Sequence, residues 1–181
     1  MPGVIFLLDE ASNARIESLW DEMEREFGVP KGFPGALPHL TAHLAGGYIL
    51  EAVRAVIEAT VATNAPFTVP TAGLGVFTGE LPILYIPVIR TPMLSTLHAH
   101  LHISLAAHCV EPEPYYAPER WMPHITVGQV DLNSEILPSL LHWLAQQPLS
   151  WDIHVQSLAI GENTETGVAL FATFPLLEWQ P

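Results

Sequence analysis

The feature that most constrains the fold of this chain is a four-residue pattern, Pro-His-x-Thr, which occurs twice. Pro38 to Thr41 and Pro123 to Thr126 carry the pattern, and each copy opens a run of residues typical of a strand. The two histidines lie 85 residues apart, and Pro66 and Pro148, which begin the next pair of strands in each half, lie 82 residues apart. This near-constant offset predicts an internal duplication of a strand-helix-strand-strand unit.

The periodicity of the apolar residues predicts the same order of elements in both halves. The first half is expected to contain a strand over 39–45, a helix over 50–63 and strands over 67–77 and 82–89. The second half is expected to contain a strand over 124–130, a helix over 134–146 and strands over 150–160 and 167–175.

Two further helices are expected outside these units. A strand over 3–8 precedes a helix that runs to Phe27, with Asp9 or Ser12 as its cap. A helix over 92–109 and a Pro-rich link over 111–118 connect the halves, and by symmetry this helix matches the N-terminal one. We therefore expect residues 1–181 to form a single α+β domain made of two pseudo-symmetric lobes.

The composition is that of a folded globular protein. Hydrophobic residues make up 49% of the chain and charged residues 14%, and the single cysteine, Cys109, cannot form an internal disulfide. The apolar run from Val4 to Leu8 is too short for the core of a signal peptide, and no run approaches the roughly 18 apolar residues of a membrane span. We expect a cytoplasmic protein without a membrane segment, and the oligomeric state stays open.

The charge balance limits the partners that the protein can bind. Six Lys and Arg residues stand against 19 Asp and Glu residues, which gives a net charge of −13. Extended nucleic acid is normally held by many contacts from Lys and Arg to phosphates, so this class of partner is not expected. A small substrate with one or two phosphates remains compatible, because a local site can attract anions on an acidic protein.

The repeated pattern has a clear chemical use. Residues i and i+2 of a strand point to the same face, so His39 projects with Thr41 and His124 with Thr126. Two imidazoles that titrate near pH 7 can serve as base and acid in breaking a P–O bond, and the two hydroxyls can hold the phosphoryl oxygens. We therefore expect the four side chains to meet in one cleft as the catalytic set, without a metal or any other cofactor.

Other residues near the two motifs are candidates for substrate binding. His43 shares the predicted strand face of Thr41, so it either lines the site or only caps the wall of the cleft. Tyr116 and Trp121 precede the second motif, where an aromatic ring either stacks on a base or packs the Pro-rich link. Arg120, and Lys31 in the loop before the first motif, are candidate positive charges or ordinary solvated side chains.

The run from Leu97 to His102 contains three histidines but is not expected to bind a metal. On a helix only His98 and His102 share a face, and the sequence has no glutamate placed as in the HExxH zinc motif. We interpret these histidines as polar-face neighbours of a leucine stripe.

Pro38-His39-Leu40-Thr41 and the segment from Trp121 to Val127 resemble the paired His-x-Thr/Ser motifs of the 2H phosphoesterase superfamily, also called the 2′-5′ RNA ligase or cyclic phosphodiesterase family. The resemblance implies a bilobal α+β fold with a cleft between two antiparallel sheets and helices on the outside. It also implies His39 with Thr41 and His124 with Thr126 as the two catalytic pairs. The family acts without a metal on 2′,3′-cyclic phosphates of nucleotides or RNA ends, on ADP-ribose cyclic phosphate, or on 2′-5′ linkages.

The resemblance leaves three functions to compare. The first is a phosphodiesterase that hydrolyses a small 2′,3′-cyclic phosphate or a related nucleotide phosphodiester. The second is a binding module that holds a nucleotide or phosphorylated metabolite in the same cleft without catalysis. The third is an RNA-end enzyme, but Gly128 and Gln129 stand where several RNA-acting members have a basic residue.

Overall fold

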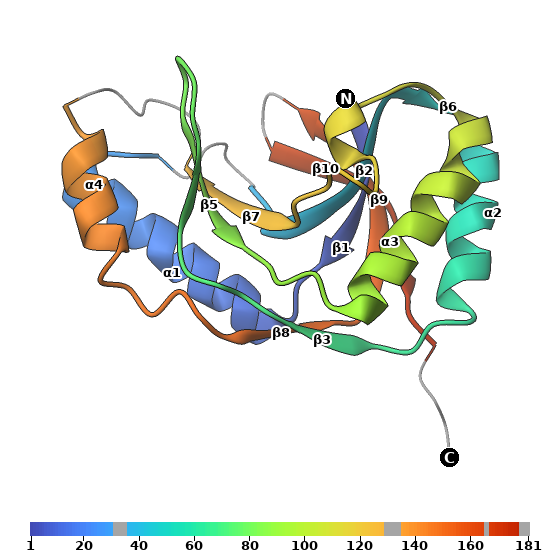
Figure 1. Ribbon diagram of the computed structural model, residues 1–181, viewed down its shortest axis with the longest axis horizontal. Helices are drawn as coiled ribbons and strands as arrows, with labels where there is room; N and C mark the ends of the chain where they lie inside the picture. The colour runs from blue at the N-terminus through green and yellow to red at the C-terminus, as the bar shows by residue number, and fades with distance from the viewer. Residues whose placement is uncertain (31–35, 129–134, 165–166, 178–181) are drawn as a thin grey trace.

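The computed structural model describes residues 1–30, 36–128, 135–164 and 167–177 (Figure 1). The helices are α1 (Glu10–Phe27), α2 (Leu50–Val61), α3 (Pro92–Leu105) and α4 (Leu137–Leu144), with 3-10 turns η1 (Ala106–His108) and η2 (Pro114–Tyr116). The strands are β1 (Pro2–Leu7), β2 (His39–Tyr48), β3 (Phe67–Pro70), β4 (Gly75–Phe77), β5 (Ile83–Pro87), β6 (Cys109–Pro112), β7 (His124–Gly128), β8 (Asp152–Val155), β9 (Ser157–Thr164) and β10 (Gly167–Pro175).

Two antiparallel sheets dominate the molecule. The larger sheet has the strand order β10-β9-β1-β2-β6 and the smaller one β4-β5-β7, while β3 and β8 form a separate ladder. Figure 1 shows α2 and α3 beside the larger sheet, α1 running below β7, and α4 on the side of the molecule opposite to α2 and α3. The predicted α+β class with antiparallel sheets and outer helices is confirmed.

Helix boundaries follow local capping chemistry. The side chain of Asp9 accepts a hydrogen bond of 2.9 Å from the backbone N–H of Ser12, so Asp9 is the N-cap of α1. Gly28, with a φ of 67°, ends the same helix in the left-handed conformation that glycine adopts readily. Between these caps one face of α1, including Ile16, Trp20 and Met23, is buried in the core.

The two halves follow the same path and exchange strands. The order β1-α1-β2-α2-β3-β4 returns as β5-α3-β7-α4-β8-β9, with β6 inserted and β10 added. The last strand of each half pairs with the first strand of the other, β4 with β5 and β9 with β1. In the ladder of β3 and β8, Phe67 pairs with Val155 and Pro70 with Asp152. A shift of 85 positions along the sequence takes Phe67 to Asp152 and Pro70 to Val155, so β3 and β8 occupy equivalent positions in the two halves.

Both strands that carry a Pro-His-x-Thr pattern have a β-bulge directly after the threonine. The ladder of β1 and β2 passes from Ile5–Thr41 to Val4–His43, which leaves Ala42 without a partner on β1. The ladder of β5 and β7 passes from Tyr85–Thr126 to Leu84–Gly128, which leaves Val127 without a partner on β5. A bulge reverses the alternation of side chains, so residues beyond it change face.

Several predicted elements differ from the observed ones. The strands expected over 67–77 and 150–160 are each divided in two, because β3 and β8 pair with each other while β4 and β9 join different sheets. The helix expected over 92–109 ends at Leu105, because Cys109–Pro112 extends as β6 along the edge of β2. The second-half strand and helix expected over 124–130 and 134–146 are β7 and α4, and residues 129–134 between them lie outside the described residues.

No helix among the described residues is long and apolar enough to cross a membrane.

Candidate active site

A cavity of about 300 Å³ receives side chains from both halves of the chain. The two predicted pairs, His39 with Thr41 on β2 and His124 with Thr126 on β7, all line it. Further lining residues include Ile5, Trp20, Leu37, Leu44, Ile83, Tyr116, Glu162 and Val168. Strands far apart in sequence thus bring two imidazoles and two hydroxyls to one cavity.

The two histidines are held in the same way. The Nδ1 of His39 lies 2.7 Å from the carbonyl oxygen of Leu37, and the Nδ1 of His124 lies 2.7 Å from the carbonyl oxygen of Met122. A carbonyl only accepts, so Nδ1 carries the proton in each neutral ring and Nε2 is left as the free base. In both motifs the accepting residue precedes a proline, which restricts that residue to extended conformations and so helps to fix its carbonyl.

Burial keeps both rings neutral to lower pH than usual. The pKa of His39 is lowered chiefly by burial, against the opposing hydrogen bond to Leu37, and the charge of His124 lowers it further. The pKa of His124 is also lowered by burial, against its hydrogen bond to Met122. The effect of one ring on the pKa of the other follows from their facing a common cavity.

A tyrosine stands beside the first threonine. Tyr116 from η2 lines the cavity together with Thr41, and the side chain of Thr41 partly offsets the effect of burial on the pKa of Tyr116. Burial raises the pKa of Tyr116, so the phenol stays protonated and can donate a hydrogen bond. The structure therefore adds a third hydroxyl to the two predicted ones.

Aromatic rings surround His124 but not His39 among the described residues. Phe77 and Tyr85 stack with ring centroids 4.1 Å apart, and their centroids lie 5.0 and 5.3 Å from that of His124. The ring of Tyr85 also fills the space that a side chain at Gly75 would need. Sequence reasoning did not select this wall, although Tyr85 stands opposite Thr126 in the ladder of β5 and β7.

The charges at the cavity differ from the predicted ones. Among its described lining residues there is no Lys or Arg, and Glu162, missed by the sequence reasoning, is the acidic one. Arg120 does not line the cavity; its guanidinium carbon lies 5.0 Å from the ring centroid of Tyr115. Lys31, the other candidate positive charge, lies outside the described residues.

The placement of His43 in the cavity was wrong. The bulge at Ala42 turns His43 to the opposite face of β2, where it is 1% exposed and its Nδ1 lies 2.6 Å from the hydroxyl of Tyr48. Its ring centroid lies 5.3 Å from that of His102 on α3. Burial lowers the pKa of His43 to about 4, with a further lowering by the charge of His102.

Of the two alternatives for Trp121, the structure supports packing and not contact with a substrate, because this ring is buried behind β2. It is 2% exposed and stacks on His98, and its indole N–H donates to the carbonyl of Thr41. His98 is completely buried and bonds to the carbonyl of Ala42, so this histidine packs against β2. Within the described part of the chain, no group of three or more His, Cys, Asp or Glu residues could hold a metal ion.

The chain matches a known protein family over most of its length. The family model described as the 2′-5′ RNA ligase superfamily matches residues 8–165. A comparison with curated protein sequences finds no match.

Solved structures share the fold at low sequence identity. TT0787 of Thermus thermophilus superposes with a TM-score of 0.68 at 15% identity, with 97% of each chain covered. E. coli LigT in its apo form gives a TM-score of 0.61 at 15% identity, covering 98% of this chain and 97% of LigT. The crystal structure of E. coli LigT complexed with 3′-AMP gives 0.56 at 13% identity, with 98% of each chain covered.

Proposed function

Because the chain belongs to the 2′-5′ RNA ligase superfamily, the 2H phosphoesterases, we propose that it is a metal-independent phosphodiesterase that hydrolyses a small 2′,3′-cyclic phosphate or a related nucleotide phosphodiester. One observation carries the proposal: His39 and His124 face one cavity, each with Nδ1 bonded to a carbonyl and Nε2 free. Such a pair supplies a base and an acid without a metal.

The proposed reaction uses one histidine in each protonation state. The neutral Nε2 of one ring takes a proton from water, whose oxygen attacks the phosphorus in line with the leaving oxygen. The P–O bond to the 2′ or 3′ oxygen breaks, and the protonated ring of the other histidine gives its proton to that oxygen. The products are a phosphomonoester and a free hydroxyl, and the two rings have exchanged protonation states. Substrate orientation decides which histidine takes which role.

The hydroxyl groups support the proposed reaction at the phosphoryl oxygens. Thr41 lies in the first half and Thr126 in the second, each two residues after its histidine, and Tyr116 lines the same cavity. Neutral donors aimed at non-bridging oxygens position the phosphorus and stabilise the charge that grows in the transition state.

The size and charge of the cavity favour a small substrate. A volume of about 300 Å³ is at the lower end for small-molecule sites. The lack of Lys and Arg among the described lining residues disfavours ligands with several phosphates, and the carboxylate of Glu162 is paired with the N-terminal ammonium of Met1 at 3.6 Å. A cyclic phosphodiester carries a single negative charge, so it suits this site better than an RNA end with its neighbouring phosphates.

The test is hydrolysis, in the presence of EDTA, of 2′,3′-cyclic nucleotides, ADP-ribose cyclic phosphate and a short RNA with a 2′,3′-cyclic end. We expect turnover of the 2′,3′-cyclic mononucleotides, a loss of about 100-fold or more in kcat for His39→Ala and for His124→Ala, and smaller losses for Thr41→Val and Thr126→Val. His100→Ala, an exposed histidine on α3, is the matched control and should keep wild-type activity.

Two results would contradict the proposal. Turnover that disappears with EDTA would exclude the metal-independent mechanism. A wild type that is inert on the whole panel, yet binds nucleotides equally well after both histidines are replaced, would identify a binding module instead.

A further inference from the structure

Two ring N–H groups hold the bulge that follows the first Pro-His-x-Thr pattern. The indole Nε1 of Trp121 donates to the carbonyl oxygen of Thr41 at 2.9 Å, and the Nε2 of His98 donates to the carbonyl oxygen of Ala42 at 3.0 Å. The two rings stack with centroids 3.7 Å apart and planes inclined by 1°. We call Trp121 and His98 the ring clamp.

The bulge explains why the strand needs the ring clamp. Ala42 has no partner on β1, and the pairing of β2 with β6 covers only Ala45–Tyr48 of β2. The carbonyls of Thr41 and Ala42 therefore lie beyond the reach of a neighbouring strand on that edge, and Ala42 is 1% exposed. Buried carbonyls without a donor are costly, and the ring clamp provides both donors.

The ring clamp fixes the backbone on both sides of Ala42. Its two hydrogen bonds hold the peptide group that follows Thr41 and the one that follows Ala42. Because the hydrogen bond from Trp121 holds the peptide group that follows Thr41, the backbone of Thr41 has little freedom, and its side chain keeps one direction into the cavity. The clamp rings do not line the cavity, so their effect on a ligand is indirect, and Thr41 is the lining residue whose carbonyl they hold.

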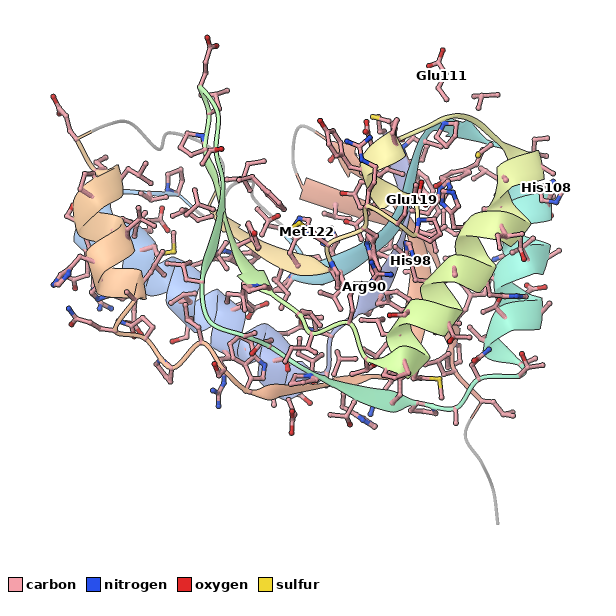
Figure 2. The ribbon with its side chains drawn as sticks, in the orientation of Figure 1. Arg90, His98, His108, Glu111, Glu119 and Met122 are labelled. Carbon is pink, nitrogen blue, oxygen red and sulfur yellow. The ribbon has the colours of Figure 1, made fainter. Side chains whose placement is uncertain are left out.

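Arg90 supports the clamp from the link between β5 and α3. Its Nη1 donates to the carbonyl oxygen of Trp121 at 3.1 Å, and its guanidinium carbon lies 5.7 Å from the centroid of that ring. Figure 2 shows Arg90 and His98 close together between α3 and the strands, below Met122. Since Trp121 precedes His124 by three residues, the clamp also ties the second motif to the first.

The second half contains the same kind of contact. Val127 is the bulged residue after Thr126, and its carbonyl oxygen accepts a hydrogen bond of 3.1 Å from the indole Nε1 of Trp20 on α1. A ring N–H from a helix thus bonds the carbonyl of the bulged residue in both halves, His98 of α3 in the first and Trp20 of α1 in the second.

We propose that Trp121 and His98 are positioning residues that set the hydroxyl of Thr41 for the phosphoryl group. The inference rests on the proposed function, because Thr41 is taken as one of the two threonines that hold the phosphate. The ring clamp fixes the backbone at Thr41 through hydrogen bonds to carbonyl groups, and the clamp itself does not contact the substrate.

The test is a double-mutant cycle on hydrolysis of the best cyclic phosphate. Trp121→Phe removes one donor, His98→Leu removes the other, and His98→Gln keeps an N–H near the position of Nε2. We expect Trp121→Phe and His98→Leu to lower kcat/KM about 10- to 100-fold, as small displacements of reacting groups do, and His98→Gln to recover most of the loss. Each change is also made in Thr41→Val and in Thr126→Val.

The coupling pattern separates positioning from general damage. In the Thr41→Val background the clamp changes should have less than about a threefold further effect, whereas in Thr126→Val their full factor should persist. Trp151→Phe, which removes an indole N–H bonded to Ser12 at 3.1 Å away from the cavity, is the control and should keep wild-type kcat/KM. An equal factor in both threonine backgrounds would overturn the proposal.

A binding measurement keeps this test separate from that of the proposed function. The affinity for inorganic phosphate is measured by calorimetry on the same set of variants, with folding checked by urea denaturation. If the wild type does not turn over any substrate, the proposed function fails, and the phosphate affinities still decide the inference. Loss of affinity that depends on Thr41 supports the ring clamp, and loss independent of Thr41 overturns it.

Discussion

His39 and His124 reach the cavity in the same protonation state for the same physical reason. A carbonyl two residues earlier accepts a hydrogen bond from the Nδ1–H of each ring, and burial lowers the pKa of each. Selecting the two histidines needed only the repeated pattern, but their tautomer depends on a backbone contact that a sequence does not display.

The lowered pKa values predict the pH dependence of catalysis. Activity needs one ring neutral and the other protonated, so kcat/KM is bell-shaped between the two apparent pKa values of the free enzyme. Both values lie below the ordinary histidine pKa of about 6.5. We expect the maximum of kcat/KM below pH 6.5, measured over pH 4 to 9 at constant ionic strength. A maximum above pH 7 would contradict this expectation.

His43 shows where the alternation of a strand misleads. Its position two residues after Thr41 predicts the same face, and this holds only for an unbroken ladder. The bulge at Ala42 depends on donors from Trp121 and His98, which are 79 and 56 residues away from it in the sequence. No local signal marks these contacts, so the bulge could not be predicted, and for Trp121 packing was only one of two alternatives.

Among the elements, β5 has a role that its short apolar sequence conceals. Its residue Tyr85 stands opposite Thr126, contacts the ring of His124 and lies across Gly75 of β4. The wall beside His124 is therefore built by two neighbouring strands. Glycine is required in β4 because any side chain at position 75 would collide with the tyrosine ring.

This arrangement predicts the effect of Gly75→Ala. A Cβ at this position would overlap the Tyr85 ring, which must move away and release His124 from its aromatic neighbours. We expect a loss of about 1 to 3 kcal/mol in the free energy of unfolding, with a lower kcat/KM. Urea denaturation and steady-state kinetics measure the two quantities.

The matched control for this substitution is Gly79→Ala in the turn between β4 and β5. A Cβ at Gly79 would meet no atom within 4 Å. We expect the control to retain both the stability and the activity of the wild type. A Gly75→Ala protein indistinguishable from it would show that Tyr85 can move without consequence.

At the scale of the whole molecule, the repeated pattern and the apolar periodicity predicted most elements and their order. The bounds of α1 were predicted well because its caps at Asp9 and Gly28 are local. Each of two predicted strands is divided in the structure, one into β3 and β4 and the other into β8 and β9. This division was not predicted, since it depends on which sheet each segment joins. We propose that the chain is one domain of two pseudo-symmetric lobes, on the evidence of the repeated element order and the shared bulges.

The buried histidines between β2 and α3 predict how stability depends on pH. Burial lowers the pKa values of His43 and His98 to about 4 in the folded protein. The groups that face them are His102, Tyr48 and Arg90. In the unfolded chain both histidines take up protons near pH 6.5, so stability is full above that pH and falls as the pH is lowered towards 4. The loss amounts to about 3 kcal/mol at most for each histidine.

His43→Gln tests this dependence, since glutamine can still bond Tyr48 but does not titrate. We expect the free energy of unfolding of the wild type to fall between pH 6.5 and 4, and to fall less steeply in the variant, as measured by urea denaturation. His100→Gln on the exposed side of α3 should follow the wild-type curve. A variant with the wild-type slope would exclude His43 as a source of the pH dependence.

The exchange of strands between the halves has a consequence for the ancestry of the fold. Neither half alone can complete its sheet, because β1 needs β9 and β5 needs β4. A chain with only one half could complete its sheets by associating with a second copy. Each copy would give its last strand to the other, and the strands equivalent to β3 and β8 would pair across the twofold axis. In such a strand-exchanged homodimer each subunit would supply one histidine and one threonine to a shared cavity. Gene fusion would then have freed the two copies to diverge, and the aromatic wall, which the described residues place beside His124 and not beside His39, would be one mark of that divergence.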